Sequence, residues 1–117
     1  MRNFKELLVW QKSIDVVVLV YKPTKAFPDE ERYGLVNQMR RSAVSIPSNI
    51  AEGHMRSTNK DFGLFVSIAR GSCAELETQI LISHQLVYFD QETYNQLTNR
   101  IEEIAKMLSV FHAKLTS

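Results

Sequence analysis

The chain has 117 residues, 44% of them hydrophobic, and 14 Lys and Arg against 13 Asp and Glu give a formal net charge of +1. This length predicts one domain, 1–117, that can bury a core without metal or disulfide staples. The single cysteine, Cys73, excludes an internal disulfide, and no Cys/His cluster has zinc-ligand spacing. The longest apolar run, 16–21, is too short to cross a bilayer, and no apolar leader stretch is present. We therefore expect a cytoplasmic protein with no membrane partner.

The apolar residues of the first segment, about 4–24, recur every three or four positions, which predicts a helix. Asn3 followed by Glu6 resembles a capping box at its start. Pro23 lacks a backbone N–H, so the helix should kink or end there. The repeat consists of Leu7, Trp10, Ile14, Val17 or Val18, and Tyr21.

A second helix is expected after the turn at 27–29 and should end near Gly53, which we interpret as a C-cap. Pro47 lies inside it and should bend it, at a cost of about 3 kcal/mol if uncompensated. The apolar stripe of this helix is Leu35, Met39, Ala43, Ile46 and Ile50.

A third helix is expected over about 59–89, with small residues at 71–74 that would let another helix approach closely. Its predicted seam is Phe62, Phe65, Ala69, Ser72, Leu76, Ile80, Ser83 and Val87, widened by Val66, Cys73 and Leu81.

The fourth helix has the most regular pattern, with Asp90 placed as its N-cap. Its seam steps by 3 and 4 without a break: Tyr94, Leu97, Ile101, Ile104, Leu108, Phe111 and Leu115. Short connections between long helices favour antiparallel neighbours. The predicted fold is therefore all-α, an up-down-up-down antiparallel four-helix bundle.

Residues that could support catalysis show no pattern that brings them together. Cys73 lies in the small-residue stretch, where a buried structural thiol is expected. His54 is expected to face solvent, and no Glu has a His three residues later, as four-helix di-iron sites require. The four glycines are isolated, so no phosphate-binding glycine loop is present. We expect neither an enzyme nor a cofactor or metal.

Charge is segregated along the chain: residues 1–25 and 36–74 each sum to +3, and 75–105 sum to −5. Such blocks either form a basic face or neutralise each other between helices, the commoner outcome at near-zero net charge. Arg40 is expected to be half-buried and paired with Glu75 or Glu77. The candidate phosphate contacts, around one end of the bundle, are Arg41, Arg56, Lys60 and Arg70.

Self-association is a further expectation. Trp10, Tyr21 and Tyr33 are core or subunit-interface residues, with the core favoured for Trp10. Long helices with wide apolar faces often have apolar surface left over after one bundle closes, and such surface favours contact between copies.

The run Arg-Arg-Ser-Ala-Val-Ser-Ile-Pro-Ser-Asn-Ile-Ala-Glu-Gly at 40–53 is distinctive, and it is accompanied by Leu-Val-Trp-Gln-Lys at 8–12 and Ala-Glu-Leu-Glu-Thr-Gln at 74–79. With these motifs the whole chain resembles the bacterial four-helix-bundle proteins encoded in intervening sequences of 23S ribosomal RNA genes. It is also similar to the accessory proteins of diversity-generating retroelements.

The resemblance implies a cytoplasmic, non-enzymatic bundle that assembles into rings, commonly pentamers. The related retroelement accessory proteins bind nucleic acid and a reverse transcriptase. Pro23 departs from the family pattern, as does His54-Met55, where relatives often carry glycine, aromatic or basic residues. The family motif maps onto Arg40, Arg41, Pro47, Asn49, Glu52 and Gly53.

Two hypotheses follow. In the first, a homo-oligomer, expected to be a pentamer, binds ribosomal or other structured RNA through the four basic residues. In the second, the ring is a protein-interaction scaffold for a partner protein and has no nucleic-acid role. The motif also has a purely structural interpretation, in which Asn49 and Glu52 satisfy backbone groups freed by Pro47 in a kinked helix.

Overall fold

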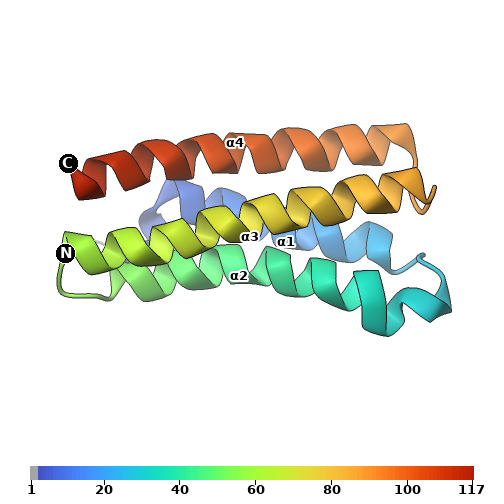
Figure 1. Ribbon diagram of the computed structural model, residues 1–117, viewed down its shortest axis with the longest axis horizontal. Coiled ribbons are helices and arrows are strands. Elements are labelled where there is room, and N and C mark those ends of the chain that lie inside the picture. The colour runs from blue at the N-terminus through green and yellow to red at the C-terminus, as the bar shows by residue number, and fades with distance from the viewer. Residues whose placement is uncertain (1–2) are drawn as a thin grey trace.

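The computed structural model describes residues 3–117, and within them it contains four α-helices and no strand. Consecutive helices run in opposite directions, α1 contacts α2 and α4, and α3 contacts α2 and α4, which makes an up-down-up-down bundle (Figure 1). The bundle measures 44 × 23 × 20 Å. No helix in the described chain is long and apolar enough to cross a bilayer. The helices are α1 (Leu8–Thr24), α2 (Asn37–His54), α3 (Asn59–Gln85) and α4 (Gln91–Thr116). The predicted fold is confirmed.

The core lies along the centre of the bundle, and α4 contributes to it as its pattern predicts. Its four central seam residues are at most 1% exposed. Both ends of the seam pack against the core while remaining partly exposed. Asp90 is the N-cap, and its Oδ1 accepts from the backbone N–H of Thr93 at 2.8 Å. The buried seam residues are Leu97, Ile101, Ile104 and Leu108.

The start of α1 differs from the sequence prediction. Asn3 Oδ1 accepts from the backbone N–H of Lys5, not of Glu6, at 2.9 Å, and this bond opens a short 3₁₀ turn, η1 (Phe4–Glu6). The α-helix begins only at Leu8. At the other end Pro23 occupies the last turn, and α1 ends one residue later, as expected from the missing N–H.

The entry into α2 is irregular, because the 3₁₀ turn η2 (Asp29–Glu31) and the π-helical turn η3 (Arg32–Val36) precede it. Gly34 has φ −108° and ψ −113°, which interrupts the helix. The Glu31 carboxylate accepts from the backbone N–H of Leu35 at 3.3 Å and from the hydroxyl of Tyr88 at 2.8 Å. This contact ties the α1–α2 connection to the α3–α4 connection.

Two predictions for the 47–53 motif are wrong, namely the backbone contact of Asn49 beside Pro47 and the C-cap at Gly53. Asn49 Nδ2 donates to the carbonyl and hydroxyl oxygens of Ser45, at 2.8 and 2.9 Å, and not to the carbonyl of Ala43 that Pro47 frees. Gly53 is not a C-cap. It is buried inside α2, and a Cβ there would lie 2.7 Å from the Cβ of Phe65. This close approach of α2 to α3 leaves no room for a side chain at this position.

The last turn of α3 is shorter than predicted. Val87 has φ 60°, and the backbone N–H of Tyr88 donates to the carbonyl of Ser83 at 3.0 Å, the bond of a Schellman ending. The predicted seam therefore stops at Ser83. Val87 is 83% exposed and Leu81 is 45% exposed, so neither belongs to the core.

Candidate nucleic-acid interface

We call the exposed side of α3, which includes Leu64 and Ile68, the outer face of α3. Three of the four predicted phosphate-contacting residues border this face. Arg41 lies beside it in a groove between α2 and α3, and Arg70 lies beside it in a groove that includes Ala105 of α4. Lys60 occupies the first turn of the same helix. All three side chains are exposed. None of them forms a hydrogen bond or ion pair within residues 3–117.

Arg56 is already engaged. Its Nη2 lies 3.3 Å from Glu52 Oε1, and its guanidinium lies 4.6 Å from the ring centre of Phe65. An exposed pair of this kind contributes at most about 1 kcal/mol. The predicted function of Glu52 beside Pro47 is thus replaced by a pairing with Arg56.

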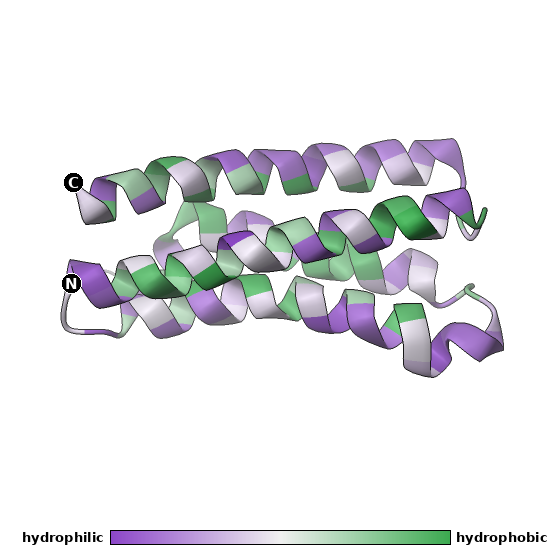
Figure 2. Ribbon diagram, in the orientation of Figure 1, coloured by the Kyte–Doolittle hydropathy of each residue, from purple (hydrophilic) through white to green (hydrophobic). Residues whose placement is uncertain are grey.

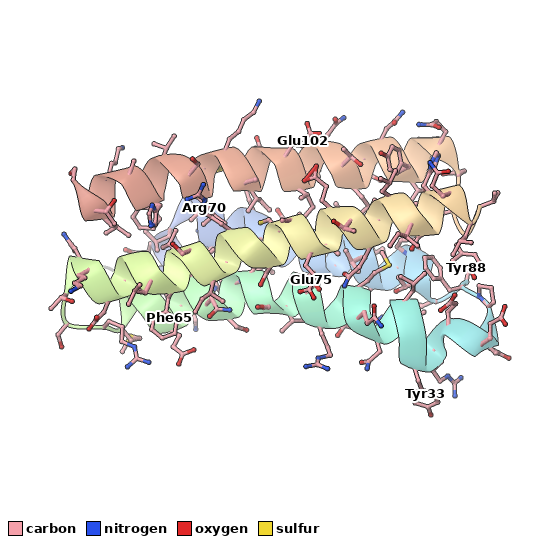
Figure 3. All side chains as sticks on the ribbon, viewed as in Figure 1. Tyr33, Phe65, Arg70, Glu75, Tyr88 and Glu102 are labelled. Atoms are coloured by element: carbon pink, nitrogen blue, oxygen red, sulfur yellow. The ribbon has the colours of Figure 1, made fainter. Side chains whose placement is uncertain are left out.

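The four residues do not form one compact cluster. Arg56 lies in the α2–α3 loop and Lys60 in the first turn of α3, whereas Arg41 lies thirteen residues before His54, the last residue of α2. At 1.5 Å per residue, Arg41 is about 20 Å from that end of α2 along the helix axis. Arg70 is marked on the side of α3 that faces α4 (Figure 3). A ligand that contacts all of them must extend along the outer face of α3.

Arg40 does not pair with Glu75 or Glu77, so that prediction is wrong. Its Nε donates to Thr24 Oγ1 at 3.0 Å, its Nη2 donates to the carbonyl of Tyr21 at 3.3 Å, and its guanidinium lies 4.4 Å from the Tyr21 ring centre. Successive residues on a helix point about 100° apart, so Arg40 faces α1 while Arg41 faces α3.

A polar groove of about 290 Å³ lies between α2 and α3. At its floor Gln79 is only 7% exposed, and its Oε1 has no hydrogen-bond partner in the described protein. Ser42, only 4% exposed, also makes no side-chain hydrogen bond there. Glu75 stands at the same boundary between the two ribbons (Figure 3). The groove is lined by Gln38, Arg41, Ser42, Ser45, Glu75 and Gln79.

The sequence analysis missed this groove. A signal was present, although the predicted seam takes Ile80 in its place: Gln79 lies three residues after Leu76 and four before Ser83, a spacing at which an apolar residue is the norm. A polar side chain at a core position indicates either a satisfied hydrogen bond or a site, and only the packing distinguishes them.

Apolar surface is exposed on the opposite side of the bundle. An outer groove of about 290 Å³ between α1 and α2 is lined mainly by apolar side chains, including Trp10, Ile14 and Val44. Trp10 is half-buried at this surface and not in the core. Leu64 and Ile68 are also exposed on the outer face of α3, 59% and 52% respectively. Figure 2 shows the contrast between α3, with hydrophobic residues on its visible surface, and the more hydrophilic α4.

Cys73 and His54 show no catalytic arrangement. Burial, with a smaller contribution from the charge of Glu77, raises the pKa of the Cys73 thiol to about 12, so the thiol stays protonated near neutral pH. His54 is half-buried, contrary to the expectation of a solvent-facing ring, and its ring meets that of Phe62 edge-on at 5.7 Å. Residues 3–117 contain no group of three or more His, Cys, Asp or Glu side chains able to hold a metal ion.

Comparisons with known proteins show one family match and a similar solved structure. A family model described as 23S rRNA-intervening sequence protein matches residues 5–110. A crystal structure of a protein with unknown function from the S23 ribosomal protein family of Bacteroides thetaiotaomicron VPI-5482 superposes with a TM-score of 0.81. It is 27% identical, and the alignment covers 89% of this chain and 98% of that one. No curated protein matches the chain. Neither description names a reaction.

Proposed function

Because the chain belongs to the 23S rRNA-intervening sequence protein family, we propose that it is a non-enzymatic bundle that self-associates and binds structured RNA. In this proposal the outer face of α3 contacts RNA phosphates, and the apolar α1–α2 side contacts further copies. The family resemblance favours a ring, commonly of five copies.

The observation that carries the RNA proposal is the set of unpaired cations around the outer face of α3. Arg41, Lys60 and Arg70 are exposed and have no carboxylate partner in the described chain. Their charge is therefore free to displace counterions from phosphates, the main source of affinity for nucleic acid. Phosphate contacts carry no base information, so this part of the binding is expected to be insensitive to sequence.

Self-association is supported by the exposed apolar side chains of α1. Ile14 and Val18 are 36% and 47% exposed and lie one turn apart, next to the half-buried Trp10. A second apolar hollow, of about 410 Å³, lies between residues 7–9 and the C-terminal part of α4. Contiguous apolar surface of this kind typically marks a protein interface.

The RNA proposal is tested with charge reversal. Arg41→Glu, Lys60→Glu and Arg70→Glu combined should abolish binding of a structured ribosomal RNA fragment at low salt and leave the circular dichroism helical signal unchanged. The matched control combines Lys22→Glu, Lys25→Glu and Arg100→Glu, with the same change in charge at exposed sites elsewhere. Loss of binding in both variants would show a non-specific charge effect and would overturn the assignment to α3.

Self-association is tested by light scattering after size exclusion. A mass of five chains that falls to one or two in Ile14→Glu/Val18→Glu, but not in the control Leu86→Glu/Val87→Glu at two exposed positions outside both apolar hollows, supports the α1–α2 interface. Wild-type protein that remains monomeric would remove the ring. An intact ring that takes up no RNA at either low or high salt would instead favour the protein-interaction scaffold.

A further inference from the structure

We propose that the apolar hollow between residues 7–9 and the C-terminal part of α4 binds an acidic amphipathic helix of a partner protein. This inference goes beyond the proposed RNA function and does not depend on it. The hollow, which we call the α1–α4 hollow, has a volume of about 410 Å³. It is lined by six apolar side chains and by two lysines, Lys106 and Lys114.

The apolar side chains of the α1–α4 hollow are only partly covered by the fold. Leu8 and Val110 are 56% and 57% exposed, whereas Val9 is buried and Phe111 is half-buried. Apolar side chains of a partner that fill the hollow would therefore remove apolar surface from water on both molecules, which favours binding. Met107, also in the lining, has a flexible side chain that can adjust to the shape of the partner.

The two lysines determine which charge the partner carries. Both are exposed, and neither forms an ion pair or a side-chain hydrogen bond within residues 3–117. Lys106 lies four residues before Val110 and Lys114 four residues after it, so one lysine stands a turn to either side of that apolar residue. At 1.5 Å per residue, the two lysines are about 12 Å apart along the axis of α4. The hollow is thus an apolar surface between two unpaired positive charges.

An amphipathic helix has the complementary pattern. Side chains one turn apart lie on the same face of a helix, so apolar residues can enter the hollow between two carboxylates placed two turns apart, which is about 11 Å. An apolar helix face seated in an apolar groove is a recurring mode of peptide recognition. Because exposed ion pairs each add little affinity, the apolar contact supplies most of the affinity and the lysines select an acidic partner.

The lysines also argue against another copy of this chain as the occupant. Among the described residues that line the groove between α1 and α2, the side assigned to contact between copies, none is acidic. A copy docked by that side would fill the hollow and leave both lysines unpaired. A bilayer surface is flat and does not fill a concave hollow. The complementary occupant is therefore a helix from a different protein.

The first experiment uses a fluorescent probe peptide of about sixteen residues, made of leucine, alanine and glutamate, with leucine along one helical face and glutamate on both sides of it. One control peptide has lysine in place of glutamate. A second control has the same composition in an order without helical period. Anisotropy with the full chain should show the acidic amphipathic peptide binding on the order of tenfold more tightly than either control. Equal binding of the three peptides would overturn the proposal.

The second experiment locates the binding and reverses its charge preference. Val110→Glu places a charge in the hollow at an exposed position and should abolish binding of the acidic peptide. Lys106→Glu/Lys114→Glu should weaken that binding on the order of tenfold and should bind the lysine peptide instead. The matched control is Lys22→Glu/Lys25→Glu, with the same change in charge at exposed sites outside the hollow. Affinity for the acidic peptide that stays unchanged in either hollow variant would overturn the proposal.

The remaining outcomes distinguish the other occupants. A fall in the mass of the wild-type oligomer in Val110→Glu, measured by light scattering, would assign the hollow to contact between copies and overturn the proposal. Binding of phosphatidylglycerol–phosphatidylcholine vesicles that Val110→Glu abolishes, with no peptide binding, would assign it to a membrane and also overturn the proposal. The variant with all three cations of the outer face of α3 reversed should retain the acidic peptide, so failure of the RNA proposal would leave this one standing.

Discussion

The fourth helix and the α2–α3 interface are both buried in the same bundle, yet they are built from different residues. The buried residues of α4 are all aliphatic: Leu97, Ile101, Ile104 and Leu108. The α2–α3 interface buries Ser42, Ser72 and Gln79 among its apolar side chains. Ser72 is satisfied, since its hydroxyl lies 2.8 Å from that of Ser45, whereas Gln79 Oε1 is not.

This difference indicates a division of functions within one core. An aliphatic seam maximises the free energy gained from burial. Because protein interiors are close-packed, it tolerates few changes in side-chain volume. Unpaired polar groups at the same depth lower stability, and each of them requires an explanation in function, in strain or in a bound water or ion. The comparison predicts that removing a buried side chain from the α4 seam lowers the free energy of unfolding, whereas replacing the buried amide of Gln79 with an apolar side chain raises it.

The largest effect is expected in the α4 seam. Leu108→Ala removes a side chain that is fully buried and should lower the free energy of unfolding by about 2–5 kcal/mol. Urea denaturation measures it, with Val110→Ala, at a 57% exposed position two residues away, as the control. A loss below about 1 kcal/mol would mean that α4 is not the stabilising side of the bundle.

The same contrast explains which features the sequence could predict. The α4 seam and its Asp90 cap follow from local pattern alone, so both were predicted correctly. Which neighbouring helix each face of α2 contacts depends on the packing of the bundle, so Arg40 was paired with Glu75 or Glu77 although it contacts α1. Gly53 looked like a C-cap because the sequence does not show the approach of Phe65.

The candidate site was predictable only in part. The unpaired cations could be selected as charged residues at exposed positions, but their separation along α2 and α3 depends on helix register in the folded bundle. The polar groove forms only when α2 and α3 pack, and its one sign in the sequence is Gln79, a polar residue at helical spacing from Leu76 and Ser83. That Oε1 lacks a partner is a property of packing, which no local pattern encodes.

Gly53→Ala is expected to have the next largest effect. The new Cβ would lie 2.7 Å from Phe65 Cβ and 2.8 Å from Phe62 Cδ1, so α2 and α3 must separate. Overpacking of this kind costs about 1–3 kcal/mol. Gly71→Ala is the matched control, because nothing lies within 4 Å of its added Cβ, and it should stabilise α3 by up to about 1 kcal/mol. Thermal unfolding of both variants tests the sign; stabilisation by Gly53→Ala would refute the close approach.

Gln79→Met is expected to have a smaller effect of the opposite sign. The substitution keeps the length of a side chain that is 93% buried and removes its unpaired amide. The free energy of unfolding should rise by about 1 kcal/mol, measured by urea denaturation. Destabilisation instead would show that the amide is satisfied in solution and would erase the contrast with α4.

The smallest effect concerns the caps that begin α3 and α4, of which only one is charged. Thr58 Oγ1 caps α3, accepting from the backbone N–H of Asp61 at 3.1 Å, and Asp90 caps α4. Hydrogen bonds from Thr93, through its side chain and its backbone N–H, lower the pKa of Asp90 below its usual 3.8. A lowered carboxyl pKa gives stability that is fully present above pH 3.8 and is lost as the pH falls through the folded-state pKa.

Asp90→Asn keeps a capping oxygen without the charge, so its thermal midpoint should lie below that of the wild type at pH 6 and converge with it near pH 2. Thr58→Ser should show a difference from the wild type that does not change over this range, because neither hydroxyl titrates. If the Asp90→Asn difference is equally constant with pH, the charge of Asp90 contributes nothing, and the caps of α3 and α4 are equivalent.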